Sequence, residues 1–349
     1  MLRTKRNSMS FAHKLLNWFD GSGRKDLPWQ RDRTFYRVWV SEVMLQQTQV
    51  NTVIPYFKRF ISRFPDIYSL ARASLDDVLH LWSGLGYYSR ARNLHKTAQL
   101  VCDYYEGEFP HDIDNVVSLP GIGRSTAGAI LALSKGERQP ILDGNVKRVL
   151  CRYHAIEGRP GQTSIEKKLW QLAEEHTPYE RISEYTQAIM DLGATLCRRR
   201  RPHCGLCPFE EDCLAHARGE EEKYPNRKSS GKIPVHESVF LVIRGEEKHL
   251  LLEKRPPAGI WGGLWSFPQL SHLNEIDQWC GREGLQILEK EALPPFRHTF
   301  SHFHLEINPV KLKVVKADLR TVREGAFLQW HSPEEIEKIG LPAPVKKLL

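Results

Sequence analysis

Four cysteines in a short run constrain this chain more than any other feature. Cys197, Cys204, Cys207 and Cys213 follow the spacing C-x6-C-x2-C-x5-C. Four soft thiolate ligands this close together hold an iron–sulfur cluster or, less often at this spacing, a zinc ion. Four successive arginines, Arg198 to Arg201, follow the first cysteine. The run therefore predicts a metal-bound loop that presents cations to an anionic surface.

The surroundings of the cysteines favour a reducing compartment. The basic stretch Met1–Arg6 is not followed by an apolar signal segment, and no apolar run is long enough to span a bilayer. Disulfides persist mainly in oxidising compartments. We therefore expect a cytoplasmic protein in which the remaining cysteines, Cys102, Cys151 and Cys280, are small buried side chains.

The 349 residues are enough for two or three domains. Residues 1–218 hold 31 Lys and Arg against 24 Asp and Glu, whereas the remainder is almost neutral. The first part is thus the one suited to neutralising phosphates. Residues 219–234 are polar and contain Pro and Gly, which predicts a linker.

The apolar periodicity changes at this linker. Before it, helical spacing is seen at Phe11–Phe19, Val50–Phe60 and Leu94–Val101. After it, Val239–Ile243 and Leu250–Leu252 read as two strands joined by a turn, and Phe303, Leu305 and Ile307 alternate with polar residues. The predicted fold class is an all-α domain over residues 1–218 and a smaller α+β domain over residues 235–349.

A second motif, at Leu119–Leu131, joins two helical patterns through Pro120-Gly121-Ile122-Gly123. Two glycines allow a sharp turn that presents backbone N–H groups and a helix N-terminus to an anionic oxygen. An ordinary corner between two helices explains L-P-G-x-G about equally well. The small residues Ala127–Ala129, which allow close helix packing, and the basic cysteine loop favour a phosphate-binding hairpin.

These motifs together resemble the helix-hairpin-helix DNA glycosylase superfamily and its endonuclease III-like branch. Four further segments resemble the adenine DNA glycosylases within it, and they are Ser41–Val50, Gly84–His95, Leu142–Val149 and Phe296–His304. The resemblance runs from about Phe11 to the C-terminus.

The resemblance implies a base-excision repair enzyme that flips adenine out of duplex DNA and hydrolyses its glycosidic bond where it is mispaired with 8-oxoguanine or guanine. It also implies one [4Fe–4S] cluster on the four cysteines, a six-helix barrel with a cluster subdomain, and a Nudix-like C-terminal domain that reads 8-oxoguanine. Its partner would be duplex DNA, bound by a monomer at the bacterial nucleoid.

Cleaving an N-glycosidic bond requires one protonated carboxyl to assist the leaving base and one carboxylate to stabilise the sugar cation. Glu42 lies among aromatic and aliphatic residues that would raise its pKa, and Asp143 precedes a helix whose N–H groups favour the carboxylate. From the residues alone, Glu42 could instead lie on a solvated helix face, and Asp143 could simply cap its helix. The resemblance makes Glu42 the proton donor and Asp143 the cation stabiliser.

Ser125 decides the predicted reaction class. Superfamily members that also cut the DNA backbone carry a nucleophilic lysine at this position, so the resemblance implies base removal with little or no strand cleavage. Lys147 could trap an aldehyde slowly, but we expect it to contact phosphate.

The resemblance also implies a set of DNA contacts. Backbone contacts are expected from Gly121, Gly123, Lys147 and Arg198, Arg199, Arg200 and Arg201. Base and pocket contacts are expected from Trp29, Leu45, Gln47, Thr48, Leu85, Tyr87, Ser125, Asn145, Gln187, Met190, Phe300, Ser301 and His302. Trp29 and Met190 could equally be core residues.

Two alternatives concern the C-terminal domain. His298, His302 and His304 at alternate positions could suggest a metal site, but no suitably spaced Cys or Asp joins them. A Nudix fold could hydrolyse nucleotides, but residues 274–284 lack the R-E-x-x-E-E pattern that holds magnesium. A third alternative is a non-catalytic DNA-binding module with zinc in the cysteine loop.

Overall fold

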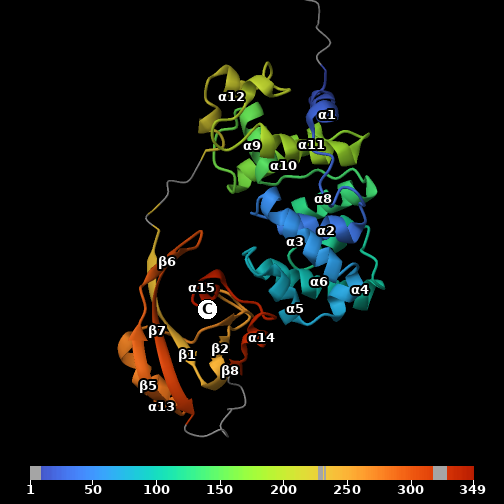
Figure 1. Cartoon of the computed structure of the whole chain (residues 1–349). Coiled ribbons are helices and arrows are strands. Elements are labelled where there is room, and N and C mark those ends of the chain that lie inside the picture. The colour runs from blue at the N-terminus through green and yellow to red at the C-terminus, as the bar shows by residue number, and fades with distance from the viewer. Residues whose placement is uncertain (1–8, 227–230, 232, 317–327) are drawn as a thin grey trace, which may run out of the picture. The chain divides into compact units, whose positions relative to one another are not determined.

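Helices fill the first part of the chain, and strands dominate the last third (Figure 1). The structure is a computed structural model, and it describes residues 9–226, 231, 233–316 and 328–349. The basic Met1–Arg6 stretch lies outside these residues, as do linker positions 227–230 and 232. Contacts divide the chain into unit 1, Met1–Ala71 with Lys96–Ser229, and unit 2, Arg72–His95 with Ser230–Leu349.

Unit 1 is helical, and each apolar stretch predicted to be a helix forms one. Its helices are α1 (Phe11–Ser22), α2 (Phe35–Leu45), α3 (Val50–Arg63), α4 (Ile67–Arg72, which ends at the unit boundary), α7 (Ile113–Ser118), α8 (Arg124–Lys135), α9 (Gly144–Tyr153), α10 (Thr163–His176), α11 (Ile182–Thr195) and α12 (Leu214–Ala217). Helix α6 (Ser89–Tyr105) begins in unit 2 and continues into unit 1. Ser10 and Thr34 cap α1 and α2 by accepting hydrogen bonds from first-turn N–H groups.

Two glycines let the central helices approach closely. A Cβ on Gly193 of α11 would lie 2.5 Å from Cβ of Asn145 on α9, and a Cβ on Gly128 of α8 would lie 2.7 Å from the Pro140 carbonyl oxygen. Neither site has room for a larger residue. The small-residue run after the hairpin therefore packs against the segment that leads to Asp143.

The first residues of the predicted linker pack on unit 1. Tyr224 is fully buried in its core, and Glu220 N–H donates to the Ala215 carbonyl at 2.9 Å. A polar composition had suggested that this stretch could not bury a core. One aromatic ring and the carbonyls around it are enough to anchor the stretch.

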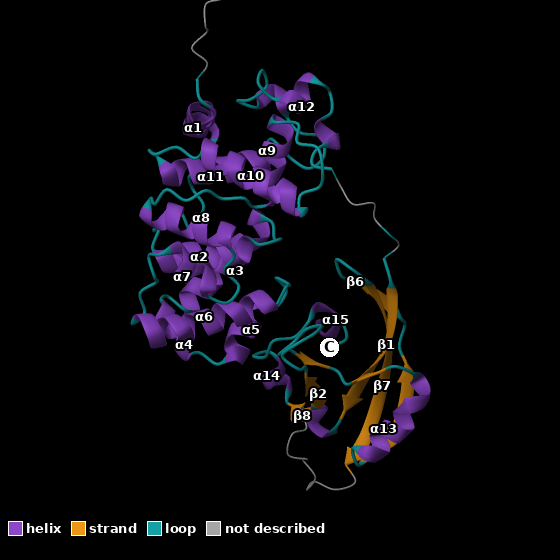
Figure 2. Ribbon diagram, turned by 180° about the vertical axis from the view of Figure 1, so that it is seen from behind, coloured by secondary structure: helices purple, strands orange, loops and turns teal. Residues whose placement is uncertain are grey.

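Unit 2 is built on a mixed sheet (Figure 2). The strands of the described chain are β1 (Val235–Arg244), β2 (Leu250–Lys254), β3 (Trp265–Ser266), β4 (Gln269–Leu270), β5 (Leu285–Ala292), β6 (Phe296–Thr299), β7 (His304–Lys316) and β8 (Leu328–His331). The main order is β3-β2-β1-β7-β5, with β1 and β7 parallel and the other pairs antiparallel. The expected strand–turn–strand at β1 and β2 is confirmed.

Short helices complete unit 2. They are α5 (Leu75–Trp82), α13 (Ile276–Arg282), α14 (Pro333–Ile336) and α15 (Ala343–Lys346). Ile276 and Cys280 of α13 pack in the core with strand residues such as Leu241 and Leu312. Among the described residues, no helix combines the length and the apolarity that crossing a membrane requires.

Candidate active site and nucleic-acid interface

Glu42 and Asp143 form an interacting pair of carboxyls in unit 1. Glu42 lies on α2 with its neighbours Ser41 and Val43 buried. Burial raises the pKa of Glu42 to about 8, and the nearby charge of Asp143 adds to the increase. No hydrogen bond from another described residue reaches the Glu42 carboxyl group. At neutral pH, Glu42 is therefore protonated.

Asp143 is held in a different environment at the N-terminus of α9. Its Oδ1 accepts hydrogen bonds from the backbone N–H groups of Asn145 at 3.0 Å and Val146 at 2.8 Å, and its Oδ2 accepts from Asn145 Nδ2 at 3.1 Å. Burial raises the pKa of Asp143, while these hydrogen bonds and the charge of Arg148 oppose the rise. Because Glu42 lacks such donors among the described residues, Asp143 is the member of the pair that ionises first.

The glycine motif forms the connection between α7 and α8. Gly121 has φ 78°, which favours glycine, and both Gly121 and Gly123 are exposed. Gly123 caps α8 without a side-chain hydrogen bond, so the first-turn N–H groups face outward. Ser125 Oγ accepts from Leu142 N–H at 2.9 Å, which links the hairpin to the residue before Asp143.

A buried polar cluster surrounds Gln187 on α11. Asp191, one turn later, is fully buried, and its Oδ1 accepts from Gln187 Nε2 at 2.9 Å. Arg24 donates to Asp191 from Nη2 at 2.5 Å, from Nε at 3.0 Å and from its backbone N–H at 2.9 Å. Because a carboxylate only accepts, the Gln187 amide must turn its nitrogen toward Asp191 and leave its oxygen as the free acceptor.

Asp191 and Arg24 were not predicted from the sequence. Their only signal is the i,i+4 spacing of Gln187 and Asp191 on one helix, because Arg24 lies 167 positions from Asp191. Of the other expected pocket residues, Trp29 is buried with its ring edge-on to Phe57, and Met190 is partly buried. Both positions are compatible with a core role.

Two of the expected base-contacting residues have strained backbones. Gln47, just past α2, is exposed with φ 57°, and Tyr87, in the loop after α5, is 44% exposed with φ 49°. Non-glycine residues in this region are uncommon and cluster at functional sites. Leu45 and Thr48 are partly exposed. Leu85 is buried, so it cannot meet a base unless the loop moves.

The four clustered cysteines converge on one cavity of about 30 Å³ in unit 1. Burial, with smaller contributions from Glu221 and the neighbouring cysteines, raises the pKa of Cys204 to about 11. Burial together with the neighbouring cysteines raises the pKa of Cys207 to about 12. The pKa of Cys213 is raised as well, again mainly by burial, and a cationic group would stabilise the thiolates of these cysteines. The donor set therefore fits a metal cluster.

Arg152 of α9 ties the cysteine loop together. It is 2% exposed, and its Nη1 donates to Cys197 Sγ at 3.3 Å and to the Arg198 carbonyl at 2.7 Å. Its Nε donates to the carbonyls of Glu221 at 2.8 Å and Tyr224 at 3.1 Å. One buried guanidinium thus joins α9, the start of the loop and the segment that follows it.

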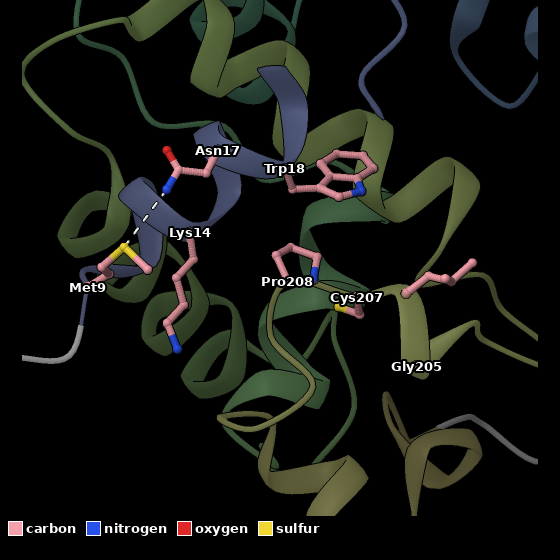
Figure 3. A pocket seen from close by; sticks show the side chains of 8 residues that line it. Met9, Lys14, Asn17, Trp18, Gly205, Cys207 and Pro208 are labelled. Atoms are coloured by element: carbon pink, nitrogen blue, oxygen red, sulfur yellow. Dashed lines mark hydrogen bonds between the residues drawn. The ribbon is translucent and has the colours of Figure 1, made fainter. Parts of the chain in front are cut away.

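A hollow of about 550 Å³ lies beside the cysteine loop (Figure 3). Trp18 and Lys14 of α1 line one side, and Cys207 and Pro208 line the other. Cys207 also borders the cavity that the four cysteines share. This cysteine therefore separates that cavity from the hollow.

The basic residues differ in how free they are. Arg198, Arg199, Arg200 and Arg201 are all exposed at the edge of the cysteine loop. Lys147, by contrast, donates to Glu166 Oε1 at 2.7 Å. A phosphate contact from Lys147 would have to replace this ion pair, whereas the arginine run is already open to an anion.

Phe300, Ser301 and His302 form the tip of the hairpin between β6 and β7 in unit 2. Phe300 N–H donates to the Phe303 carbonyl at 2.9 Å, and Ser301 and His302 are exposed. The Phe300 ring lies 5.5 Å from that of Trp261, centroid to centroid. Among the described residues, the one set of three His, Cys, Asp or Glu side chains whose ligand atoms all lie within 4.8 Å of one another is Cys204, His216 and Glu221, so the hairpin histidines form no set this tight.

The comparisons identify the family. Residues 40–175 match the model of the HhH-GPD superfamily of base excision DNA repair proteins, and residues 239–349 match the NUDIX domain. The adenine DNA glycosylase of Buchnera aphidicola subsp. Acyrthosiphon pisum is 44% identical over 97% of this chain and 96% of its own length. The human adenine DNA glycosylase is 35% identical over 97% of this chain and 73% of its own. This chain belongs to the adenine DNA glycosylase family.

Members of the adenine DNA glycosylase family are enzymes of base excision repair that act on the N-glycosidic bonds of DNA. The helical part of this family member has the fold of a thermostable thymine-DNA glycosylase, with a TM-score of 0.54 and 25% identity over 60% of this chain and 95% of that one. A structure of endonuclease III with DNA gives a TM-score of 0.51 at 22% identity, covering 60% and 94%. The predicted fold class is thus confirmed.

Proposed function

We propose that this adenine DNA glycosylase removes adenine mispaired with 8-oxoguanine or guanine, and that it does so by hydrolysis without efficient strand cleavage. The observation that carries the reaction is the Glu42–Asp143 pair, in which one carboxyl is protonated at neutral pH and the other is held by N–H donors. Two carboxyls in unequal environments are what acid-assisted cleavage of a glycosidic bond needs.

In the proposed reaction, Glu42 gives its proton to N7 of the flipped adenine as the bond between N9 and C1′ breaks. The bonding electrons leave with the base, and the sugar becomes an oxocarbenium-like cation. The Asp143 carboxylate stabilises that cation. Water then adds to C1′, and its proton passes to a carboxylate of the pair, which leaves an abasic site.

Adenine would be recognised by the amide oxygen of Gln187. Asp191 orients this oxygen as an acceptor, and the exocyclic amino group of adenine is a donor. Guanine presents an acceptor at the same position, so the orientation favours adenine. Trp29, Met190 and Asn145 would complete the surroundings of the base.

Asp191→Asn tests this assignment. The asparagine can offer its NH₂ group to Gln187, which releases the amide to flip, and it removes the partner of Arg24. We expect single-turnover excision to fall by about 10–100-fold, as for loss of a buried charge-assisted contact. The control is Asp20→Asn, which removes an exposed partner of Arg181 and should excise normally. Equal rates for both variants would remove Asp191 from this role.

DNA would be held through its backbone and read through its bases. The phosphate contacts are proposed for Gly121, Gly123, Lys147 and Arg198, Arg199, Arg200 and Arg201. Gln47 and Tyr87 would insert into the base stack, with Leu45 and Thr48 beside them, whereas the buried side chain of Leu85 is not proposed as a contact. The backbones of Gln47 and Tyr87 are strained, with φ 57° and 49°. Strain of this kind is found mainly where it serves function, which supports the insertion of these two residues.

The absence of a lysine at Ser125 supports the lack of strand cleavage. The serine hydroxyl is engaged by Leu142 N–H and cannot form a Schiff base with the sugar. Lys147, which follows Asp143 by one turn of α9, is paired with Glu166.

Cys197, Cys204, Cys207 and Cys213 would hold one [4Fe–4S] cluster. Such a group supplies structural cross-links and has no assigned part in base release. The DNA contacts would be made by residues of the chain, because the loop between the first two cysteines presents Arg198 to Arg201 to phosphate. Zinc is the competing occupant, and iron analysis of the purified protein distinguishes the two.

We further propose a division of labour along the chain. Residues 1–218 would bind the DNA and excise adenine, and residues 219–234 would link the two domains. Residues 235–349 would recognise 8-oxoguanine through Phe300, Ser301 and His302. The exposed position of Ser301 and His302 at a hairpin tip supports a reading role. A monomer at the nucleoid would suffice.

The proposed function is tested with 8-oxoguanine and guanine opposite adenine in otherwise identical duplexes. We expect adenine release from both, faster with 8-oxoguanine, and no strand break without added alkali. Ser301→Ala combined with His302→Ala should reduce the preference by about tenfold or more, as for loss of a good base contact. Glu289→Ala with Lys313→Ala, which removes an exposed ion pair of the same sheet, is the matched control. An unchanged preference in the Ser301 and His302 variant would assign the reading role elsewhere.

A further inference from the structure

The loop between α5 and α6, residues Gly84–Tyr88, belongs to unit 2 together with the C-terminal strands. Three of its five residues are left-handed, with φ 101° at Gly84, 80° at Gly86 and 49° at Tyr87. A tight loop of this kind needs contacts that fix it, because the strained conformation is otherwise a minor one. Some of these contacts come from the loop's own neighbours.

Trp82 and Arg90 hold the loop from within. Trp82 Nε1 donates to the Gly86 carbonyl at 3.1 Å, and Arg90 Nη2 donates to the same carbonyl at 3.0 Å. The Arg90 guanidinium also lies 5.4 Å from the centre of the Tyr87 ring. The path of the loop is thus set by the residues that flank it on α5 and α6.

Those flanks are in turn held by the C-terminal part of the chain. On the α5 side, Ser83 Oγ donates to the Leu341 carbonyl at 2.6 Å. On the α6 side, Arg92 Nη1 donates to the Gly262 carbonyl at 2.7 Å. Both acceptors are backbone atoms of segments remote in sequence, and all four residues lie in unit 2. The two bonds grip the loop at both ends.

The fit around these bonds is close. A Cβ on Gly340 would lie 3.1 Å from the backbone carbon of Leu79, and a Cβ on Gly263 would lie 3.1 Å from Leu79 Cδ1. Leu79 and Leu341 are buried. The C-terminal segments therefore pack tightly against α5. A displacement of these segments would also displace α5 and the loop that follows it.

The grip also reaches the hairpin tip. Gly262, whose carbonyl accepts from Arg92, directly follows Trp261, and the Trp261 ring contacts Phe300. Trp261 is itself left-handed, with φ 56°. One short segment thus contacts both α6, which directly follows the loop that carries Tyr87, and the hairpin that carries Ser301 and His302.

We propose that Ser83 and Arg92 are positioning residues that fix the Gly84–Tyr88 loop to the C-terminal segments, so that Tyr87 and the hairpin tip address the same mispair in a fixed geometry. This inference rests on the proposed function for the contacts of Tyr87 and Ser301 with DNA. The gripping of the loop itself stands on the hydrogen bonds alone and is tested separately.

The loop is tested first without DNA. In the full-length protein carrying Ser83→Ala and Arg92→Met, hydrogen–deuterium exchange of the amides in residues 84–88 should rise by about tenfold or more. The control is Lys254→Gln, which breaks the ion pair to Asp76 at the other end of α5 and should change exchange in the loop by less than twofold. Unchanged exchange in a folded double variant, or an equal rise in the control, would overturn the gripping of the loop.

The readout on DNA uses duplexes in which 2′-fluoro-deoxyadenosine, which resists excision, stands opposite 8-oxoguanine or guanine. We expect Ser83→Ala and Arg92→Met each to weaken binding to the 8-oxoguanine duplex severalfold and to reduce the preference over guanine. Ser83→Thr and Arg92→Lys, which keep a donor, should restore most of the preference. At saturating protein, the single-turnover excision rate should stay within about threefold of the original, since the carboxyl pair is untouched.

The outcomes separate the two proposals. If the unaltered protein shows no preference for 8-oxoguanine, the proposed function fails, while the exchange experiment still decides whether the loop is gripped. If the preference exists and exchange rises but the preference is unchanged in both single variants, Ser83 and Arg92 are structural only. That result would contradict their positioning role.

Discussion

Glu42→Gln is expected to stop adenine release and at the same time to stabilise the protein. Glutamine has nearly the same shape but no proton to donate, and general acid catalysis contributes about 10²–10⁴-fold to such reactions. Binding to an adenine·8-oxoguanine duplex should remain largely intact. Single-turnover kinetics and a binding titration measure the two effects separately.

The stabilisation follows from the raised pKa of Glu42. Its folded pKa of about 8 exceeds the ordinary glutamate pKa of 4.5. An unfolded chain therefore releases this proton earlier than the folded one, and stability is lost as pH rises from about 5 to 8. Glutamine does not ionise and so avoids this loss of stability, which for a pKa shift of this size is on the order of 2–5 kcal/mol above pH 8. The gain in melting temperature should grow with pH across that window.

Glu174→Gln is the matched control, because Glu174 is a partly exposed carboxylate paired with Arg138. It should leave excision unchanged and should not stabilise the protein. If Glu42→Gln destabilised the protein at pH 8, Glu42 would be ionised and favourably paired in the fold, contrary to its surroundings.

Arg152→Met is expected to empty the cysteine loop of metal. The substitution keeps an unbranched apolar stem but removes the guanidinium, which leaves the carbonyls of Arg198, Glu221 and Tyr224 without their donor. Each buried acceptor left unsatisfied costs about 1–3 kcal/mol, so the loop should loosen. Iron per protein should fall at least fourfold, with a lower melting temperature.

Two further variants, Arg152→Lys and Arg218→Met, show whether iron is lost because the hydrogen-bond network is broken or because a positive charge is removed. Lysine keeps the charge but cannot reach several carbonyls at once, so we expect partial iron loss. Arg218 is exposed beside the loop, and its replacement removes a charge without touching the network. Full iron content in purified Arg152→Met would show that the cysteines hold the loop without this residue.

Residues that act within a local motif could be named from the sequence. The four cysteines, the two glycines of the hairpin and the cap residue Asp143 all have roles set by near neighbours, because spacing and backbone geometry are local properties. Glu42 could be named because apolar neighbours surround it on its own helix. The two-part fold was equally accessible, since the apolar period changes from helical spacing to alternation after the linker.

Residues whose environment is made by distant segments could not be named. In the sequence, Asp191 has the features of an acidic residue on a helix surface, and nothing indicates that Arg24 pairs with it. Arg152 likewise has the features of an ordinary basic residue, although carbonyls between residues 198 and 224 surround it in the fold. The placement of α5 in unit 2 could not be predicted either, because its hydrogen bonds join it to residues 178 and 259 positions away. Tyr224 shows the converse, a single buried ring inside a polar stretch.

The central claim is that Glu42 works protonated and Asp143 ionised. The most direct measurement is the single-turnover rate of adenine release between pH 5 and 9.5 at saturating protein. We expect the rate to fall about tenfold per pH unit once the pH passes about 8, where Glu42 loses its proton. We also expect a decline at low pH, where Asp143 with its raised pKa becomes neutral. A rate that stays constant from pH 7 to 9.5 would contradict the account.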